Sequence, residues 1–170
     1  CNPPNMTSMR DATDLVMQTG QETIDATKLL KKIAETPYAP NATYPTSKLG
    51  NQLKEAARMI KGNIGLEVVE VDYGGWDTHN GQGGSTGNFA NRVGTLSDAV
   101  AAFYQDMGSR MEDVMLVTMS DFGRTAAENG TGGTDHGWAN CMLALGGCSM
   151  RPKGHNHSPV LGKWPGLTPK

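Results

Sequence analysis

Carboxylate and imidazole side chains recur in this 170-residue chain at spacings that suit a metal ion. Asp77 and His79 lie two positions apart, so in an extended segment both side chains project to the same side. Mg²⁺, Mn²⁺ and Zn²⁺ all accept such a mixed oxygen and nitrogen pair. A turn aspartate beside a surface histidine leaves the same pattern, so this pair alone does not establish metal binding.

Two later stretches add further candidate ligands. Asp121 follows an apolar run, where an unpaired carboxylate is costly unless a cation or an arginine meets it. Arg124 is the local partner, and an ion pair between the two explains Asp121 as well as metal ligation does. Asp135 and His136 are adjacent in a glycine-rich stretch, where a turn aspartate and a backbone-bonded histidine are the structural alternative.

Taken together, these groups predict a site for one or two divalent cations, which we expect to be Zn, Mn, Mg or Ca. A guanidinium beside such ions suits an anionic substrate, because arginine binds phosphate or sulfate through two donors at once, and Arg124 is therefore the candidate catalytic residue. The candidate metal ligands are Asp77, His79, Asp121, Asp135 and His136.

Hydrophobic patterning predicts the elements that position these residues. Residues 66–73 are rich in β-branched side chains and alternate, which predicts a strand ahead of Asp77. The apolar run 113–119 predicts a strand covered on both faces ahead of Asp121, and 141–145 a third strand. A helix over about 88–108 separates the first two, so a βαβ crossover and a parallel sheet are expected. Ligands gather beyond the carboxyl ends of such strands, where two of the motifs would meet.

The first third of the chain is predicted to be helical. Helices are expected over about 7–18 and 21–35, with Gly20 ending the first, and a third is capped by Thr46 or Ser47 and closed by Gly62. We therefore expect a single α/β domain over 1–148, with helices in 7–62 and a βαβ-type core in 66–147. An irregular basic tail is expected over 149–170.

Composition narrows the classes of partner. Fifteen basic and seventeen acidic residues give a net charge of −2, which offers no attraction to nucleic acid or to an anionic membrane. The sequence contains no run of about 18 apolar residues, which is the pattern that would predict a membrane span. Three cysteines, Cys1, Cys141 and Cys148, are too few for a disulfide framework, and either one disulfide or three free thiols fits them. The chain opens at Cys1 without a signal peptide, as processed or excised material would.

Four motifs, GGWDTH, SDFGRT, ENGTGGTDHGWA and GKWPGL, resemble in type and order those of a bacterial family of exported proteins catalogued as domain of unknown function fifteen-oh-one. The resemblance runs from about Tyr44 to Leu167. It implies a place in the alkaline-phosphatase-like superfamily of sulfatases and phosphomutases, and hence part of a three-layer sandwich with helices on both faces of a mainly parallel sheet. It also implies an exported protein, periplasmic or extracellular.

By the same resemblance, Asp77, His79, Asp121 and either Asp135 or His136 would bind metal, although the family usually has Glu at position 121. Members of the family are longer, and in the superfamily the nucleophile comes from an early strand and loop, for which nothing before Leu66 is a candidate. The chain thus resembles the C-terminal part of a member, with another chain or a missing N-terminal segment completing the sheet. We expect a metal-dependent hydrolase of small phosphate or sulfate esters, or alternatively a non-catalytic exported protein that binds metal or assembles with others.

Overall fold

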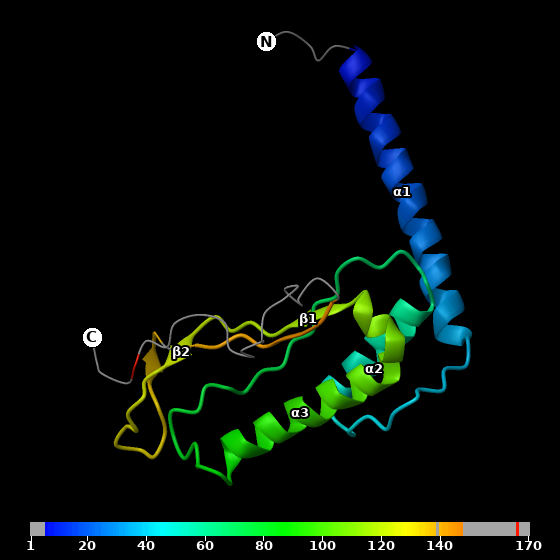
Figure 1. The fold of residues 1–170 in the computed structure, drawn as a ribbon. Helices are drawn as coiled ribbons and strands as arrows, with labels where there is room; N and C mark the ends of the chain where they lie inside the picture. Colours follow the sequence, from blue (N-terminus) through cyan, green and yellow to red (C-terminus); the bar gives the residue numbers. More distant parts are fainter. Residues whose placement is uncertain (1–5, 139, 148–165, 167–170) are drawn as a thin grey trace, which may run out of the picture.

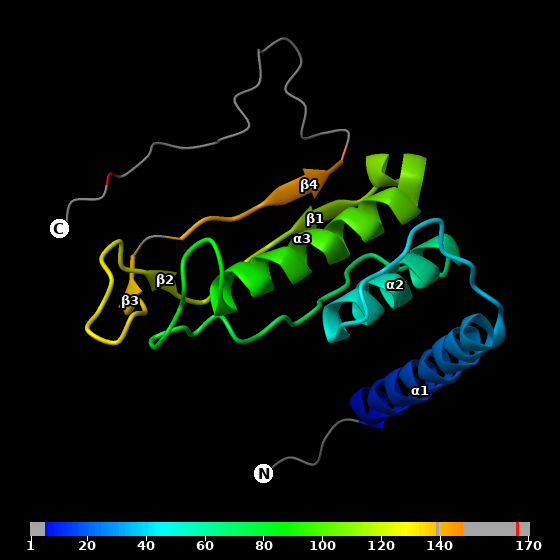
Figure 2. The same ribbon diagram turned by 90° about the horizontal axis from the view of Figure 1, so that it is seen from below.

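In the part of the chain that the computed structural model describes, residues 6–138, 140–147 and 166, helices precede short strands. Helix α1 stands apart from the remaining elements, and α2 and α3 lie side by side beneath the strands (Figures 1 and 2). The elements are α1 (Met6–Glu35), α2 (Lys48–Lys61), α3 (Asn88–Met107), the 3-10 helix η1 (Gly108–Glu112), β1 (Met115–Val117), β2 (Gly123–Arg124), β3 (His136–Gly137) and β4 (Ala144–Gly146).

The hydrophobic core lies between α2 and α3 and extends to η1. Small residues on both helices allow close approach, and Phe103 fills the space between them. Leu116 of β1 and Leu145 of β4 pack against the same cluster from above. The core residues are Leu49, Leu53, Ala56, Ala57, Ala99, Phe103, Met107 and Met111.

Helix α2 confirms the predicted third helix at both ends. The Ser47 hydroxyl oxygen accepts a hydrogen bond from the Gly50 amide at 3.0 Å, which satisfies a donor in the first turn. Gly62 ends the helix, and its amide donates to the carbonyl of Arg58. Helix α3 likewise matches the helix predicted over 88–108.

The predicted helix break at Gly20 is wrong, because α1 runs through it without interruption. A glycine inside a helix costs only about 1 kcal/mol relative to alanine. A side-chain hydrogen bond from Gln18 to Glu22 bridges the glycine, and another from Gln21 to Asp25 supports the turn that follows it. The glycine therefore did not end the helix, because the side-chain hydrogen bonds around it support helical conformation on both sides.

Within the described residues, the strands form two antiparallel pairs. Met115 to Val117 of β1 pair with Gly146 to Ala144 of β4, and β2 pairs with β3 so that Arg124 lies opposite His136. The strands predicted at 113–119 and 141–145 are present in shortened form as β1 and β4. The predicted strand at 66–73 has no strand partner among the described residues.

The larger fold prediction is not decided by these short pairs. Two antiparallel pairs neither show nor exclude an alkaline-phosphatase-like parallel sheet, so that sheet and the 1–148 domain boundary stay predictions. The tail 149–170, Cys1 and Cys148 lie outside the described residues, whereas Cys141 is an exposed free thiol. Within the described residues, no helix combines the length and the hydropathy that crossing a membrane requires.

Asp106, on the buried face of α3, fastens the loop between α1 and α2 to the core. Its side chain is 1% exposed and accepts hydrogen bonds from the hydroxyls of Tyr38 and Tyr44 and from the backbone amide of Asn41. The Lys61 ammonium lies 2.5 Å from the same carboxylate. Burial and the bonds to Asp106 raise the pKa of both tyrosines. A buried carboxylate that accepts this many hydrogen bonds fixes the position of the loop that leads into α2.

Candidate metal centre

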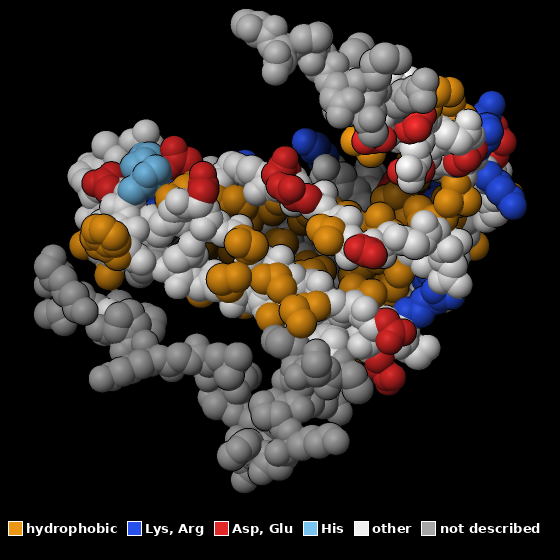
Figure 3. Space-filling view, turned by 90° about the horizontal axis from the view of Figure 1, so that it is seen from above, with side chains coloured by type: hydrophobic (Ala, Val, Ile, Leu, Met, Phe, Trp, Pro, Cys, Tyr) orange, Lys and Arg blue, Asp and Glu red, His pale blue; other side chains and the backbone are white. Residues whose placement is uncertain are grey.

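The candidate ligands gather at the end of the molecule where α3 begins, beside β2 and β3 (Figure 2). The short ladder between β2 and β3 places Arg124 opposite His136. The loop after residue 73 brings Asp77 to the same place. In the space-filling view, histidine and acidic side chains lie together at this end of the surface (Figure 3).

A glycine turn and an aromatic anchor shape the loop that carries Asp77. Gly75 has φ of +87°, a left-handed conformation that favours glycine, and the Arg92 guanidinium packs directly against it. The Trp76 indole N–H donates to the Tyr73 carbonyl at 2.6 Å, and its ring meets Phe89 of α3 edge to face. These contacts hold the loop against the start of α3.

Three side chains converge on one point. Asp77 Oδ1 lies 3.0 Å from His79 Nε2 and 2.9 Å from His136 Nε2. Asp77, His79 and His136 each offer one ligand atom, and these atoms lie within 4.8 Å of one another. Donor atoms around a tetrahedral ion with bonds of 2.0–2.2 Å lie roughly 3.3 Å apart. To hold an ion, this group, hereafter the Asp77 triad, would lengthen the two contacts of Asp77 slightly and bring the two histidine nitrogens to a similar separation.

The two ring nitrogens of His79 both face carboxylates. His79 Nδ1 lies 3.0 Å from Asp135 Oδ1, while Nε2 faces Asp77. A neutral imidazole has only one N–H to donate, so one of the two contacts calls for a second proton or for a metal ion in its place. A carboxylate on the far nitrogen of a metal-binding histidine is the usual arrangement that fixes its orientation. Asp135 therefore fits a positioning role better than a ligand role.

Asn129 and Gln82 hold the first and third motifs together, and neither was predicted. The Asn129 side-chain amide donates to the His79 carbonyl and to Asp135 Oδ1, both at 2.9 Å. Gln82 Oε1 accepts from the hydroxyls of Thr78 and Thr134, each at 2.7 Å. The signal for Asn129 was an Asn within a Gly- and Thr-rich stretch, a composition that favours side-chain bonds to nearby backbone.

Gly133 sits where the two motifs touch. A β-carbon on Gly133 would meet the His79 carbonyl oxygen at 2.2 Å, which no side chain tolerates. Glycine at this position is what allows the third motif to approach the backbone of the first. No sequence pattern indicated which glycine in the stretch has that role.

Arg124 ties the motifs together through its guanidinium. Nη2 donates to the Trp76 carbonyl at 2.6 Å and lies 2.9 Å from Asp77 Oδ1, and Nη1 donates to the Thr134 carbonyl. Arg124 also lies over the Phe122 ring at 4.8 Å, and that ring stacks on His136. The local pairing with Asp121 is thus wrong, since Arg124 pairs with Asp77 in the described residues.

Asp121 lies outside the Asp77 triad. Its exposed side chain borders a separate hollow with Trp138 and Asn140. Among the described residues, the only group with metal-ligand geometry is the Asp77 triad. Ser120, which precedes Asp121, donates its hydroxyl hydrogen bond to the Phe122 carbonyl at 2.9 Å. The structure therefore brings four of the five candidate ligands together, three as a triad and Asp135 behind His79.

The electrostatic environment favours ionised carboxylates at the site. The hydrogen bond with His136 is the largest influence that holds the pKa of Asp77 below its usual range, and His79 and Arg124 add to it. Hydrogen bonds from Asn129 and then from His79 lower the pKa of Asp135. Both groups are acceptor-only carboxylates at neutral pH, as a metal ligand and a histidine partner must be.

Comparison with known proteins identifies one family. The family model described as "Protein of unknown function (DUF1501)" matches residues 4–164, which is nearly the whole chain and begins before the Tyr44 that the motifs suggested. No curated protein and no solved structure shows a significant match.

Proposed function

The chain belongs to the DUF1501 family of proteins of unknown function, and we propose that the Asp77 triad binds a divalent metal ion that serves hydrolysis of phosphate or sulfate esters. We further propose that the chain belongs to the alkaline-phosphatase-like superfamily, as the motif resemblance implies. The observation that carries the metal site is the convergence of Asp77 Oδ1 with the Nε2 atoms of both histidines.

The donor set suits a borderline cation. One carboxylate and two imidazoles are the ligands that Zn²⁺ takes in many hydrolytic sites, and Mn²⁺ accepts the same set. A bound divalent ion supplies Lewis-acid polarisation of the ester and lowers the pKa of a water molecule. Exposure of 58% at Asp77 and 54% at His136 leaves the outer side of the triad open to a substrate.

Arg124 contributes to the site mainly by position. Three of its N–H groups are already directed at Trp76, Thr134 and Asp77, so it holds the ligand loops in register. Up to two further N–H groups remain for a substrate oxygen, because a guanidinium carries five. We therefore propose that Arg124 orients Asp77 and places positive charge beside the bound anion.

A non-catalytic metal-binding role is the second candidate, and the hydroxyl groups near the site favour it. Thr78, Ser120 and Thr134 all direct their hydroxyls to local acceptors. None of the three is oriented by a general base, the arrangement that activates a nucleophile. Hydrolysis by this chain would therefore rely on activated water, whereas a binding or assembly protein would need no nucleophile.

Metal content and turnover, measured together, test the proposal. The purified chain is loaded with Zn²⁺ or Mn²⁺, dialysed, and analysed for bound metal, and hydrolysis of p-nitrophenyl phosphate and p-nitrophenyl sulfate is followed with and without chelator. We expect about one ion per chain and chelator-sensitive hydrolysis. Asp77→Ala and His136→Ala should lose both, while Glu128→Gln, an exposed acid near the site, should keep both.

Each result decides between the two candidates. One ion per chain that depends on Asp77 but supports no turnover would select the binding role. Absence of bound metal from the parent chain would reject both. Turnover that persists in the presence of chelator and in Asp77→Ala would show that the activity does not depend on the Asp77 triad.

A further inference from the structure

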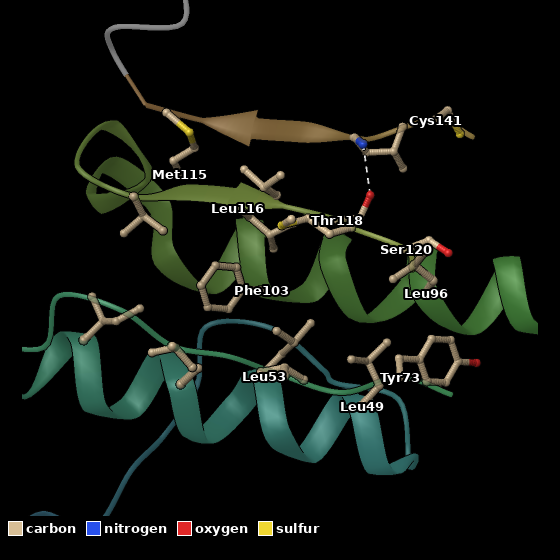
Figure 4. Close-up of a pocket in the computed structure, with 18 of the residues that line it drawn as sticks. Leu49, Leu53, Tyr73, Leu96, Phe103, Met115, Leu116, Thr118, Ser120 and Cys141 are labelled. Atoms are coloured by element: carbon tan, nitrogen blue, oxygen red, sulfur yellow. Dashed lines mark hydrogen bonds between the residues drawn. The ribbon is translucent and has the colours of Figure 1, made fainter. Parts of the chain in front are cut away.

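The hydrophobic core does not extend to the loops around the Asp77 triad. A long apolar cleft of about 1160 Å³ lies between residues 66–73 and β1, and Figure 4 shows Phe103 among the core side chains around it. Within the described residues, the core cluster has no member from 74–95 or from 117–144. Hydrogen bonds, rather than core packing, therefore position His79.

The side chain of Asn129 uses all of its hydrogen-bonding positions at this site. Its Oδ1 atom accepts from the backbone amides of Thr131 and Gly133, each at 3.0 Å. Its Nδ2 atom donates to the His79 carbonyl and to Asp135 Oδ1, each at 2.9 Å. An asparagine amide has two N–H donors and an oxygen with two lone pairs, so these four bonds fix which end of the amide faces the site.

The two ends of this amide have different partners. The oxygen binds only the turn 131–133, so it stabilises that turn. The NH₂ group binds the backbone carbonyl of His79 and also the carboxylate oxygen of Asp135 that lies 3.0 Å from His79 Nδ1. One NH₂ group thus holds both the backbone of a candidate metal ligand and the carboxylate that orients its ring. The imidazole between these two points has little freedom to turn away from Asp77.

Backbone contacts hold the two loops together independently of this NH₂ group. The amides of Gly81 and Gln82 donate to the carbonyls of Thr131 and Gly132 at 3.0 and 2.8 Å. The Thr131 hydroxyl also donates to the His79 carbonyl at 2.8 Å. Loss of the NH₂ donors should therefore leave the loops paired, so their effect on the ring can be measured in a folded protein.

We propose that Asn129 is a positioning residue of the metal centre, and that its NH₂ group sets the orientation of the His79 ring. It acts through Asp135 and through the His79 backbone, and it does not contact the ion. The inference rests on the proposed function, because a fixed ring presents Nε2 to a metal ion. A residue in this role raises metal affinity by holding a ligand in place before the ion arrives.

Asn129→Asp separates the two ends of the amide. The new carboxylate keeps an oxygen for the amides of the turn but has no N–H for Asp135 or His79. It also adds negative charge beside a cation site, which by itself would strengthen metal binding. We expect instead that Zn²⁺ affinity falls about 10- to 100-fold while one ion still binds per chain, as measured by calorimetric titration. The direction of the change therefore distinguishes lost orientation from added charge.

A charge control and a rescue variant accompany this substitution. Asn80→Asp adds the same charge next to His79, at an exposed asparagine whose side chain forms no hydrogen bond in the described part of the chain. Its Zn²⁺ affinity should equal that of the parent or exceed it slightly. In the double variant Asn129→Asp, Asp135→Asn, the amide at 135 can donate to the carboxylate at 129 and still accept from His79 Nδ1. Part of the lost affinity should therefore return.

The orientation of the His79 ring can also be followed without any metal. Long-range proton–nitrogen spectra of the metal-free chain with labelled histidine report hydrogen bonding at each ring nitrogen. In Asn129→Asp, the Nδ1 resonance of His79 should shift more than the ring resonances of His136, whose Nε2 contacts Asp77. Circular dichroism confirms that each variant is folded.

The outcomes keep this inference apart from the proposed function. Parental or tighter Zn²⁺ binding by Asn129→Asp would overturn it, and so would an unchanged His79 resonance. A double variant that binds Zn²⁺ no better than Asn129→Asp would assign the loss to the turn and would also overturn it. If the parent binds no metal, the proposed function fails, and the His79 spectrum alone decides whether Asn129 orients the ring.

Discussion

Asp135 contacts the metal-facing histidine without belonging to the triad, and this distinction is testable. Its Oδ1 lies 3.0 Å from His79 Nδ1 and would fix the ring so that Nε2 faces the ion. Asp135→Ala should weaken metal affinity about 10- to 100-fold while the ion still binds at one per chain. Calorimetric titration with Zn²⁺ or Mn²⁺ measures both affinity and stoichiometry.

A conservative substitution separates positioning from ligation. Asp135→Asn keeps an oxygen acceptor for the His79 N–H but removes the charge, so it should recover part of the lost affinity. Complete loss of binding in both variants would mean that Asp135 is itself a ligand. Unchanged affinity in Asp135→Ala would remove it from the site altogether.

At the residue scale, the sequence predicted what each motif could ligate but not how the ligands divide their roles. Asp77 and His79 were identifiable because their spacing places them on one side of an extended segment. The roles of Asp135 and Asp121 depended on the β2–β3 ladder and on which carboxylate His79 Nδ1 meets, and both are tertiary facts. Asn129 was missed because an amide in a glycine-rich loop carries no signature of the backbone it will reach.

At the element scale, Asp106 links α3 to α2 and to the loop before α2. Removing it leaves the Lys61 ammonium and two tyrosine hydroxyls without their acceptor. Asp106→Ala should therefore lower the free energy of unfolding by about 3 kcal/mol. Urea denaturation measures the change, and Asp98→Ala, an exposed acid of the same helix, should change it by no more than about 0.5 kcal/mol.

The Asp106 contribution should also depend on pH in a defined direction. Burial alone would raise the pKa of Asp106, but the bonds from Lys61 and Tyr38 outweigh it and hold that pKa below the usual range. The stabilisation is then complete above the unfolded-state pKa of about 4 and declines as the pH falls through the folded-state value. The stability gap between the parent and Asp106→Ala should narrow below about pH 4. A gap that widens there would contradict the pairing.

The two ends of α2 were predictable because capping is a local interaction, although the same kind of signal at Gly20 was misleading. Ser47 and Gly62 act within one turn of α2, where sequence alone specifies the contact. Strand pairing was not predictable in the same way, since 66–73 has strand patterning and still finds no partner among the described residues. A β-strand requires a neighbouring strand as well as alternating side chains, and the sequence of one strand does not identify its partner.

At the scale of the whole molecule, the core occupies one region and apolar surface remains in another. The core lies between α2 and α3, while Val68, Met115 and Met119 are exposed near the cleft at 83%, 51% and 81%. Apolar surface of this extent is a feature of interaction sites. That this surface is covered by another chain or by a further segment, as the motif resemblance implies, stays a prediction.

Helix α1 is the element least supported by the rest of the molecule. Every described side chain from residue 11 to 32 is exposed, and the helix projects away from the core (Figure 1). Its last turn is held by Arg58, whose Nη2 donates to the carbonyls of Ile33, Ala34 and Thr36. A helix without packing is only marginally stable in water.

Hydrogen exchange should therefore divide the molecule into two parts. Amides in residues 6–28 should exchange far faster than those of α2 and α3, because their opening costs little free energy. Arg58→Met keeps the aliphatic stem but removes the donors, so protection should also fall in the last turn of α1. Lys54→Met, on the same helix as Arg58, should leave the pattern unchanged. Protection in 6–28 equal to that of α3 would instead show that α1 is packed against a partner in solution, most simply another copy of the chain.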